Sequence, residues 1–417
     1  MYVRPLFFLL ALIIHGGAGN LTAADKPTAF YITWFQDPCR TAVIRWITCD
    51  NDHGDWLELQ KSEPKKANEA SQNWYRFKAS HKKFPDNRPY VLHSLELYNL
   101  SPDTSYAVHL EEYDHIFYFR TLPESLDHPV RFVAGGDTFR DGADVYNNMN
   151  RIAASYSPYF AALGGDIAYA TTPLPCIKED TQRWLCMLQG WMNHMVTPEG
   201  FSVPLVAAIG NHEVVGWLPN KPEKAAFYYL FFRNPSMTSY FCLNIGDYMS
   251  LLLLDSGHTE KVNKTQKDFI EEKLAAAQSM EHRFAIYHAP AYPSARRYNA
   301  CSSKKMRKHW CPLFDKYQLH IAFENHDHAY KRTPAIKNEC PNPKGTVYIG
   351  DGCWGIAEPR TPRVCENYWY LKKSASIGHC LIVDLDQKQR TVRAVDWNGK
   401  VFDSVTQKVD SVMHPPL

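Results

Sequence analysis

The feature that most constrains this chain is a set of five apolar runs, each followed by side chains with oxygen or nitrogen donors. The runs are 132–134, 160–163, 205–209, 285–287 and 321–323. Amphipathic stretches such as Ala143–Ser155 and Thr265–Gln278 lie between them, which predicts buried strands alternating with helices. Strands in an open α/β sheet bring their carboxyl ends to one crevice, where ligands bind. The pattern therefore predicts a mixed α/β domain with a polar site at one edge of its sheets.

The donors after these runs are carboxylates, imidazoles, an amide and a phenol. Along the chain they are Asp137, Asp166, Tyr169, Asn211, His212, Glu213, His288, His326 and His328. Any one of them alone would more readily be a turn, a cap or a structural histidine. Their joint occurrence after five strands favours a metal site, because carboxylate and phenolate oxygens suit a hard trivalent ion while imidazole and amide suit a borderline divalent one.

The first 122 residues have a different pattern. Arg4, the apolar run 6–14 and the small residues that follow predict a secretory signal peptide over 1–24, too short to span a bilayer. Short alternating strands then predict an all-β sandwich of fibronectin type III kind over 25–122. The spacing of Leu100, Pro102, Thr104 and Tyr106 resembles a late-strand signature of that domain. The second domain is expected over 123–417, beginning with a linker and ending in a hairpin with an Asn398-Gly399 turn.

Composition excludes some partners and raises the question of disulfides. The net charge of +2 indicates no strong field for nucleic acid or an acidic membrane, and no later segment is apolar for long enough to cross a membrane. Export would allow the 11 cysteines to pair, and the short loops that they close suggest Cys39–Cys49, Cys176–Cys186 and Cys301–Cys311. Cys340, Cys353 and Cys365 could supply a further bridge, and Cys242 and Cys380 are expected as buried thiols.

In this order the motifs resemble those of the purple acid phosphatases, a group within the calcineurin-like metallophosphoesterases. The matching motifs are Gly136-Asp137, Gly165-Asp166-Ile167-Ala168-Tyr169, Gly210-Asn211-His212-Glu213, the strand-end His288, and His326-Asp327-His328. Tyr169 is the most specific residue, because it separates this family from other calcineurin-like enzymes. The resemblance covers residues 131 to about 355 and extends to the sandwich. It implies a catalytic domain of two mixed β-sheets flanked by helices.

The resemblance also implies two adjacent metal sites. Asp137, Tyr169 and His328 would hold one ion, suspected to be Fe(III). Asn211, His288 and His326 would hold the other, which is Zn, Mn or Fe(II), and Asp166 would bridge the two. Paired cations lower the pKa of bound water from about 15.7 towards ~7, and the resulting hydroxide attacks phosphorus in line with the leaving group. His212 is implied beside the phosphate as a proton donor, with Glu213 behind the ligands.

Several positions depart from the family pattern. Thr138-Phe139 stand where the family has another residue and glycine, and Asn325 replaces a glycine. The histidines that plant members carry after the strand-end His are absent, so Tyr292, Arg296 and Arg297 become the expected substrate contacts. Arginine matches phosphate by its planar fork, although solvated surface charge is the alternative for both arginines. Asp351 to Gly355 also follows a predicted strand but stays outside the predicted site.

These observations predict an exported phosphatase that hydrolyses small-molecule phosphate monoesters. One alternative keeps the metals and acts as a phosphodiesterase on nucleotides or lipid head groups. A second alternative is a non-catalytic cell-surface binding protein, which is disfavoured because all seven ligand positions hold competent donors. The sequence indicates no nucleic-acid partner beyond a possible nucleotide substrate, and it does not indicate an oligomeric state.

Overall fold

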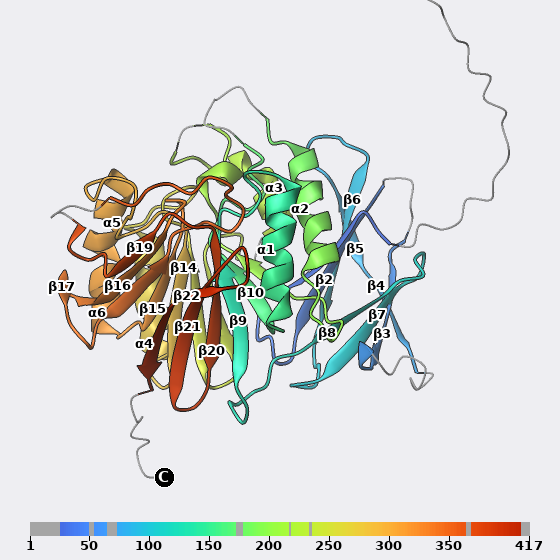
Figure 1. The fold of residues 1–417 in the computed structure, drawn as a ribbon. Helices are drawn as coiled ribbons and strands as arrows, with labels where there is room; N and C mark the ends of the chain where they lie inside the picture. The colour runs from blue at the N-terminus through green and yellow to red at the C-terminus, as the bar shows by residue number, and fades with distance from the viewer. Residues whose placement is uncertain are drawn as a thin grey trace, which may run out of the picture.

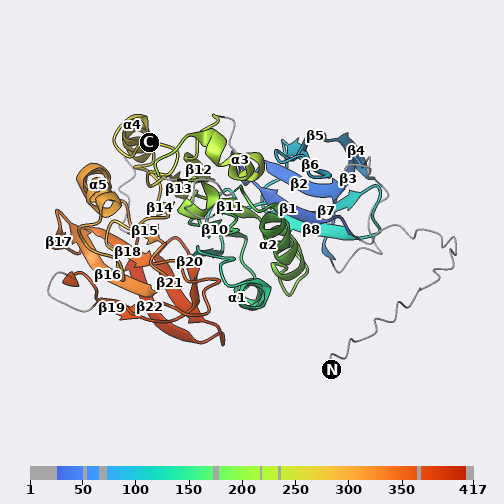
Figure 2. The same cartoon turned by 90° about the horizontal axis from the view of Figure 1, so that it is seen from above.

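The structure is a computed structural model, and it describes residues 26–49, 54–64, 73–171, 178–216, 218–232, 236–363 and 368–409. The predicted signal peptide lies outside the described residues. Figures 1 and 2 show an all-β part beside a larger part in which helices cover sheets. This is the mixed fold class expected from the two sequence patterns.

The all-β part consists of two antiparallel four-stranded sheets. The first has the order β1 (Ala29–Thr33), β2 (Ala42–Cys49), β6 (Tyr90–Leu97), β5 (Ser80–Lys83), and the second has the order β4 (Tyr75–Lys78), β3 (Trp56–Lys61), β7 (Ser105–Leu110), β8 (Ile116–Arg120). Alternate residues of both sheets face one core, in which the Phe30 and Phe117 rings stack with centroids 3.8 Å apart. The arrangement is consistent with the predicted sandwich.

Two mixed sheets form the larger part. The six-stranded sheet has the order β11 (Leu205–Ala207), β10 (Phe160–Leu163), β9 (Val130–Gly135), β20 (His379–Leu385), β21 (Gln389–Asp396), β22 (Val401–Lys408). The eight-stranded sheet has the order β12 (Phe241–Ile245), β13 (Met249–Leu254), β14 (His282–Tyr287), β15 (Ile321–Glu324), β18 (Thr346–Gly350), β16 (Tyr330–Lys337), β17 (Cys340–Pro341), with β19 (Lys373–Ala375) beside β16. Strands β9, β10 and β11 are parallel to one another, as are β13, β14, β15 and β18.

The two mixed sheets pack face to face, with helices on their outer faces. Phe132 of one sheet and Phe284 of the other meet in the shared core, with ring centroids 5.8 Å apart. Helices α1 (Ala143–Ser155), α2 (Thr181–His194) and α3 (Ala226–Phe232) share a second core with the six-stranded sheet. Helices α4 (Thr265–Ala276), α5 (Cys301–His309) and α6 (Cys311–Lys316) share a third core with the eight-stranded sheet. Short 3-10 turns lie at Asn211–Glu213 and Pro222–Lys224.

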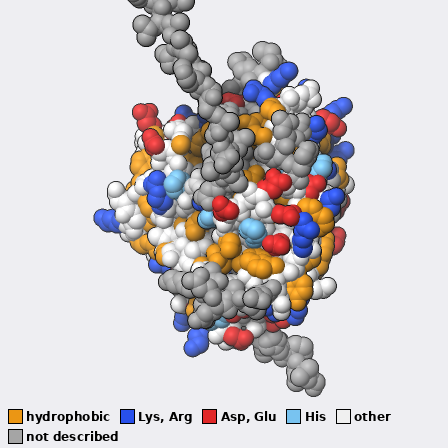
Figure 3. All heavy atoms as spheres, turned by 90° about the vertical axis from the view of Figure 1, so that its right-hand side faces the viewer, with side chains coloured by type: hydrophobic (Ala, Val, Ile, Leu, Met, Phe, Trp, Pro, Cys, Tyr) orange, Lys and Arg blue, Asp and Glu red, His pale blue; other side chains and the backbone are white. Residues whose placement is uncertain are grey.

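The sandwich is fastened to the larger part through helix α3. Tyr31 Oη donates to the Phe231 carbonyl at 3.1 Å, and the Arg45 guanidinium donates to the carbonyls of Leu230 and Phe231. These carbonyls end a short helix and lack helical partners, so a cation is favourable there. Figure 3 shows the sandwich side of the molecule, where acidic and basic side chains are interspersed. Among the described residues, none of the helices is both long and apolar enough to cross a bilayer.

The predicted short-range disulfides are wrong where both cysteines are described. Cys39 and Cys49 are free thiols, because the extended strand β2 carries Cys49 about 23 Å beyond its own start, and Cys39 Sγ donates instead to the Pro123 carbonyl. Cys301 and Cys311 are also free, because Cys301 begins helix α5, which is about 12 Å long, and Cys311 follows its far end at the start of α6. A disulfide needs Cα atoms within about 7 Å.

The remaining cysteines give no disulfide within the described part of the chain. Cys186, Cys340 and Cys353 are free thiols, whereas Cys176 and Cys365 lie outside the described residues. Cys242 and Cys380 are free thiols in strands β12 and β20; Cys380 is buried as expected, whereas Cys242 is only partly buried.

Candidate metal centre

The predicted donors meet where two sets of parallel strands end. Strands β9, β10 and β11 lead into Asp137, Asp166 and Asn211, while β14 and β15 of the other sheet lead into His288 and the 326–328 turn. The His288 Nδ1 atom lies 3.0 Å from the Gly164 carbonyl oxygen, so the two sheets are hydrogen-bonded to each other at the site. Residues that are far apart in the sequence are thereby brought into one constellation.

Three of the donor atoms form a first group. Tyr169 Oη lies 2.7 Å from Asp137 Oδ1 and 2.9 Å from His328 Nε2, and His328 Nε2 lies 2.8 Å from the same Asp137 oxygen. Asp137 is fully buried and His328 nearly so. One carboxylate, one phenol and one imidazole therefore aim at a common point.

Four donor atoms form a second group around His288. The His288 Nε2 atom lies 3.1 Å from Asp166 Oδ2, 3.1 Å from Asn211 Oδ1 and 2.9 Å from His326 Nδ1. The Asp137 carboxylate connects the two groups, because its second oxygen accepts from the His326 backbone N–H at 2.8 Å. All seven predicted ligand side chains are therefore assembled in two adjoining sets.

The backbone at the site is held in an unfavourable conformation. Five of the seven residues have positive φ, namely Asp137 (56°), Asp166 (50°), Tyr169 (52°), His326 (78°) and His328 (55°). Each such position costs on the order of 1 kcal/mol or more in a residue other than glycine. Strain of this kind persists only where the surrounding structure imposes it, and it clusters at functional sites.

The charges of the centre fit bound cations. Burial and the neighbouring Asp137 raise the pKa of Tyr169, so a phenolate at this position requires a positive charge beside it. Burial lowers the pKa of His288, but Asp166 and Asp137 outweigh it and raise that pKa to about 9. The centre thus attracts positive charge. Its oxygen and nitrogen donors, without a thiolate, suit iron, zinc or manganese.

Glu213 braces the loops that carry two of the donors. Its Oε2 accepts from the backbone N–H of Asp166 at 2.7 Å and of Gly210 at 2.8 Å, and its Oε1 accepts from Ile167 N–H at 2.7 Å. Burial and the nearby Asp166 raise the pKa of Glu213 to about 8. The side chain therefore positions Asp166 without joining the donor groups.

His212 lies at the open side of the centre. Its Nδ1 is 2.7 Å from the Thr171 carbonyl, so this nitrogen carries a proton and the other, Nε2, is left for exchange. Nε2 lies 4.0 Å from Asp166 Oδ2, and the ring stacks on Tyr169 with centroids 4.3 Å apart. The imidazole thus faces the space next to the donor atoms while remaining partly exposed.

The three expected substrate contacts have different surroundings. Arg296 Nε lies 3.2 Å from Asp327 Oδ1, and an Arg296 terminal nitrogen donates to the His326 carbonyl at 3.4 Å, which puts the guanidinium beside the centre. Arg297 is exposed. Tyr292 is only 1% exposed and packs against Tyr348, with centroids 4.6 Å apart. A substrate contact for Tyr292 is therefore wrong, because its ring belongs to the core between the sheet and α5.

Sequence reasoning missed a second arginine, Arg360. Its backbone N–H donates to the His328 carbonyl at 2.7 Å. Burial and the repulsion of the nearby Arg296 lower the pKa of Arg360. Two guanidinium groups therefore lie close together at the rim of the centre. Arg360 follows a proline in an irregular loop, and no periodic signal in the sequence marks it.

The loop after β18 also borders the site. A Cβ atom on Gly352 would lie 1.8 Å from Asp137 Oδ2, so only glycine fits this position. The backbone of Gly355 donates to the Asp137 carbonyl at 2.9 Å.

Another residue that sequence reasoning missed is His258, after β13, whose ring centroid lies 5.5 Å from that of His288. For the loop after β18 and for His258 after β13, the sequence signal that could have found them is a polar residue directly after a buried strand.

The two departures from the family pattern are accommodated locally. Thr138 Oγ1 donates to the Ile167 carbonyl at 2.5 Å, which ties the first and second donor loops together. The Asn325 side chain donates to the Tyr287 carbonyl at 2.9 Å. It fills the space over two glycines, since a Cβ on Gly136 or Gly164 would lie 2.5 Å or 1.7 Å from an Asn325 side-chain atom.

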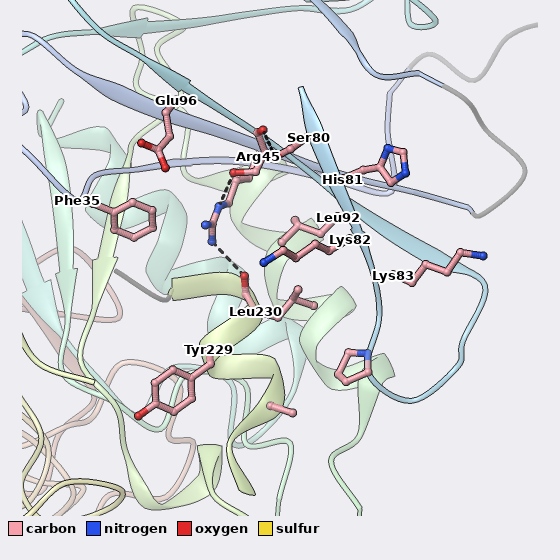
Figure 4. A pocket seen from close by; sticks show the side chains of 13 residues that line it. Phe35, Arg45, Ser80, His81, Lys82, Lys83, Leu92, Glu96, Tyr229 and Leu230 are labelled. Atoms are coloured by element: carbon pink, nitrogen blue, oxygen red, sulfur yellow. Dashed lines mark hydrogen bonds between the residues drawn. The ribbon is translucent and has the colours of Figure 1, made fainter. Parts of the chain in front are cut away.

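Large aromatic side chains between the second donor loop and His288 pack in the interior. Trp184, Trp191 and Tyr228 are at most 2% exposed, and Trp217 lies outside the described residues. A cavity of about 440 Å³ opens elsewhere, between the sandwich and α3 (Figure 4). It is lined by residues such as Arg45, and none of the seven donors lines it. Cavity size therefore does not locate the metal centre.

Comparisons with known proteins agree with this geometry. Residues 130–330 match the family model described as calcineurin-like phosphoesterase. Purple acid phosphatase 5 of Arabidopsis thaliana is 24% identical over 410 residues, covering 91% of each chain, and Fe(3+)-Zn(2+) purple acid phosphatase 12 of the same plant is 23% identical, covering 90% of this chain and 81% of that one. The purple acid phosphatase PPD1 from yellow lupin (Lupinus luteus) seeds superposes with a TM-score of 0.72 at 17% identity, over 92% of this chain and 74% of that one. Residues 130–330 therefore carry a calcineurin-like phosphoesterase domain, and the chain as a whole is similar to purple acid phosphatases in sequence and in fold.

Proposed function

We propose that the protein hydrolyses phosphate monoesters at a centre of two metal ions. Asp137, Tyr169 and His328 would hold the first ion, Asn211, His288 and His326 would hold the second, and Asp166 would bridge the two. The observation that carries the proposal is the assembly of all seven donors in two adjoining groups, with atoms 2.7–3.1 Å apart. Two cations at these points supply Lewis acidity and a nucleophilic water near neutral pH.

The chain's own groups bind the substrate and handle the proton. Arg296 and Arg360 present two guanidinium groups beside the centre, and their planar forks match the oxygens of a phosphate group. His212 holds a proton at Nε2 when charged, and it gives this proton to the leaving oxygen. Its Nδ1–H bond to the Thr171 carbonyl fixes the ring in this orientation.

Iron is proposed at the tyrosine-containing site and zinc, manganese or Fe(II) at the other. The phenolate oxygen supports a hard trivalent ion, and one of the relatives is itself named as an Fe(3+)-Zn(2+) enzyme. An oxidised preparation is expected to be violet, because tyrosinate bound to ferric iron absorbs visible light, and Tyr169→Phe is expected to bleach it. A colourless preparation with two zinc or manganese ions would contradict the iron but not the hydrolase.

Purified protein tests the activity directly. We expect two metal ions per chain and a higher kcat/KM on p-nitrophenyl phosphate than on bis(p-nitrophenyl) phosphate. A preference for the bis-ester would indicate the phosphodiesterase instead. Metal-loaded protein that is inert on both esters would overturn the catalytic proposal and leave the non-catalytic binding protein.

The domain division and the cellular location are proposed as well. We assign 25–122 to the sandwich and 123–417 to the catalytic domain, supported by the strand β8 (Ile116–Arg120) before the boundary and β9 (Val130–Gly135) after it. Export rests on the signal-like residues 1–24. Mass spectrometry of secreted protein beginning at residue 25 would support both export and the cleavage position, whereas retention of the intact N-terminus inside the cell would contradict them.

A further inference from the structure

A second group of possible metal ligands lies in the sandwich. The Nδ1 atoms of His81 and His93 both lie 2.9 Å from Asp55 Oδ1. All three ligand atoms lie within 4.8 Å of one another. This spacing is similar to that in the centre described above, where His288 Nε2 and Asp166 Oδ2 are 3.1 Å apart.

The cluster is built by the pairing of strands. His81 on β5 and His93 on β6 are directly opposite in the antiparallel register, so their side chains share one face of the sheet. Asp55 precedes β3 of the other sheet. The three residues therefore join the two sheets of the sandwich at the open edge formed by β5.

Two of the three ligands are held rigidly. The His93 ring is 2% exposed, stacks on Trp46 with centroids 4.9 Å apart, and has Thr48 Oγ1 2.9 Å from its Nε2. A hydrogen bond at the second ring nitrogen is the usual device that orients a metal-binding histidine. The loop that carries Asp55 is fixed by the Trp46 indole, which donates to the Gly54 carbonyl at 3.2 Å.

The third ligand leaves the site open to solvent. The His81 side chain is 54% exposed. Figure 4 shows the His81 and Lys82 side chains leaving β5 on opposite sides, at the border of the cavity beside α3, which both residues help to line. A cation can reach the cluster from water, and solvent can complete its coordination.

We propose that Asp55, His81 and His93 form a site for a divalent transition metal, with Zn²⁺ as the best fit. Two imidazoles and one carboxylate suit Zn²⁺, whereas Ca²⁺ and Mg²⁺ prefer a full set of oxygens. Three protein ligands leave one tetrahedral position for water. The bound ion joins the two sheets of the sandwich, and it stabilises the folded state because the unfolded chain does not hold the three ligands together.

The experiment uses metal-loaded full-length protein and adds Zn²⁺. Zinc uptake is measured by equilibrium dialysis with elemental analysis, and the Tm is followed by calorimetry. The test variant is His81→Ala, because the exposed ring can be removed without leaving a hole in the core. The matched control is His109→Ala, whose imidazole is paired with Glu58 at 3.0 Å in the same sandwich.

We expect the unaltered protein and His109→Ala to bind one Zn²⁺ more than His81→Ala. Saturating Zn²⁺ should raise the Tm of the first two by about 5 °C and should not raise that of His81→Ala. A second variant, Asp55→Asn, should weaken this uptake at least about tenfold, because it removes the ligand charge. Equal zinc uptake and equal Tm shifts in all four proteins would overturn the proposal and leave a hydrogen-bonded Asp–His pair network.

Discussion

The candidate metal centre and the sandwich cluster share carboxylate and imidazole donors but place them by different means. At the centre the ligands follow strand ends from two sheets, and five of the seven have positive φ. In the sandwich cluster His81 and His93 lie in strands β5 and β6 and Asp55 lies directly before β3, and none of the three is among the described residues with positive φ. The proposed catalytic donors thus lie on a strained and braced backbone, whereas the two histidines of the cluster are placed by the register of β5 and β6.

The largest expected effect is a loss of activity in a variant that alters the metal centre and leaves the sandwich cluster unchanged. Asp166 belongs to the second donor group, and its other oxygen accepts from the His212 backbone N–H at 2.7 Å. Asp166→Asn should lower kcat/KM by at least about 10³-fold and reduce the metal content, because the proposed bridging ligand loses its charge.

The control for that variant is Glu271→Gln. Glu271 is an exposed carboxylate paired with Lys316 on the surface, so its kcat/KM should stay within about twofold of the unaltered protein. Similar activity in Asp166→Asn and the control would mean that the two donor groups do not form the active site.

A smaller effect, on metal retention, tests whether the hydrogen bonds of Glu213 to the donor loops distinguish the metal centre from the sandwich cluster. Glu213 receives three backbone N–H groups, and a glutamine would offer one acceptor oxygen in place of two. Glu213→Gln should weaken metal retention about 10- to 100-fold, measured as metal lost to a chelator over time. Retention equal to that of the unaltered protein would show that the strained loops hold the ligands without a brace.

A steric test addresses the contact between the sheets at the centre. A Cβ on Gly164 would lie 1.7 Å from Asn325 Nδ2. Gly164→Ala should therefore destabilise the protein by about 2 kcal/mol, measured by denaturant unfolding.

The double variant with Asn325→Gly should recover part of this loss, because the smaller residue makes room for the new methyl group. Strictly additive losses in the single and double variants would contradict the coupling of Gly164 with Asn325. No comparable steric coupling is expected in the sandwich cluster, which depends on strand register.

The smallest expected effect is on the pH dependence of the free energy of unfolding, to which a glutamate outside both regions contributes. Glu179 lies outside both clusters, and burial raises its pKa to about 8, while its Oε2 accepts from Phe227 N–H at 3.2 Å. Between pH ~4.5 and 8 the folded state therefore binds more protons at Glu179 than the unfolded state. The free energy of unfolding should fall as pH rises through this window.

Glu179→Gln should remove a decline on the order of 1 kcal/mol, measured by urea unfolding at pH 5 and pH 8. What remains of the pH dependence can then be assigned to other groups, including the two clusters. An unchanged slope in the variant would mean that Glu179 ionises normally in the folded protein.

The strand-end donors could be predicted because a buried strand and its polar end are both written locally in the sequence. Asp137, Asp166 and His288 each follow an apolar run, and the parallel pairing of the strands brings their carboxyl ends, and so these donors, to the same edge. The disulfides could not be predicted from loop length, because helix α5 between Cys301 and Cys311 separates the two thiols. Short sequence separation is not short distance once the segment between is helical or extended.

Other residues depend on packing that no local pattern specifies. Tyr292 follows the strand-end histidine by four positions, yet its ring turns into the core against Tyr348. Arg360 reaches the centre through a backbone hydrogen bond from an irregular loop to the His328 carbonyl. The His81 and His93 pair appears only when the register of β5 and β6 is known.

The division of the donors between two sheets bears on when the protein can acquire its metals. Each proposed ion takes side chains from both sheets, such as Tyr169 with His328, or Asn211 with His326. A newly made chain that ends at Glu213, just after β11, carries Asp137, Asp166, Tyr169 and Asn211 but none of the three histidine ligands, and its six-stranded sheet still lacks β20, β21 and β22. On this proposal both ions would bind only after the C-terminal strands have been synthesised and paired, and each bound ion would then cross-link the two sheets.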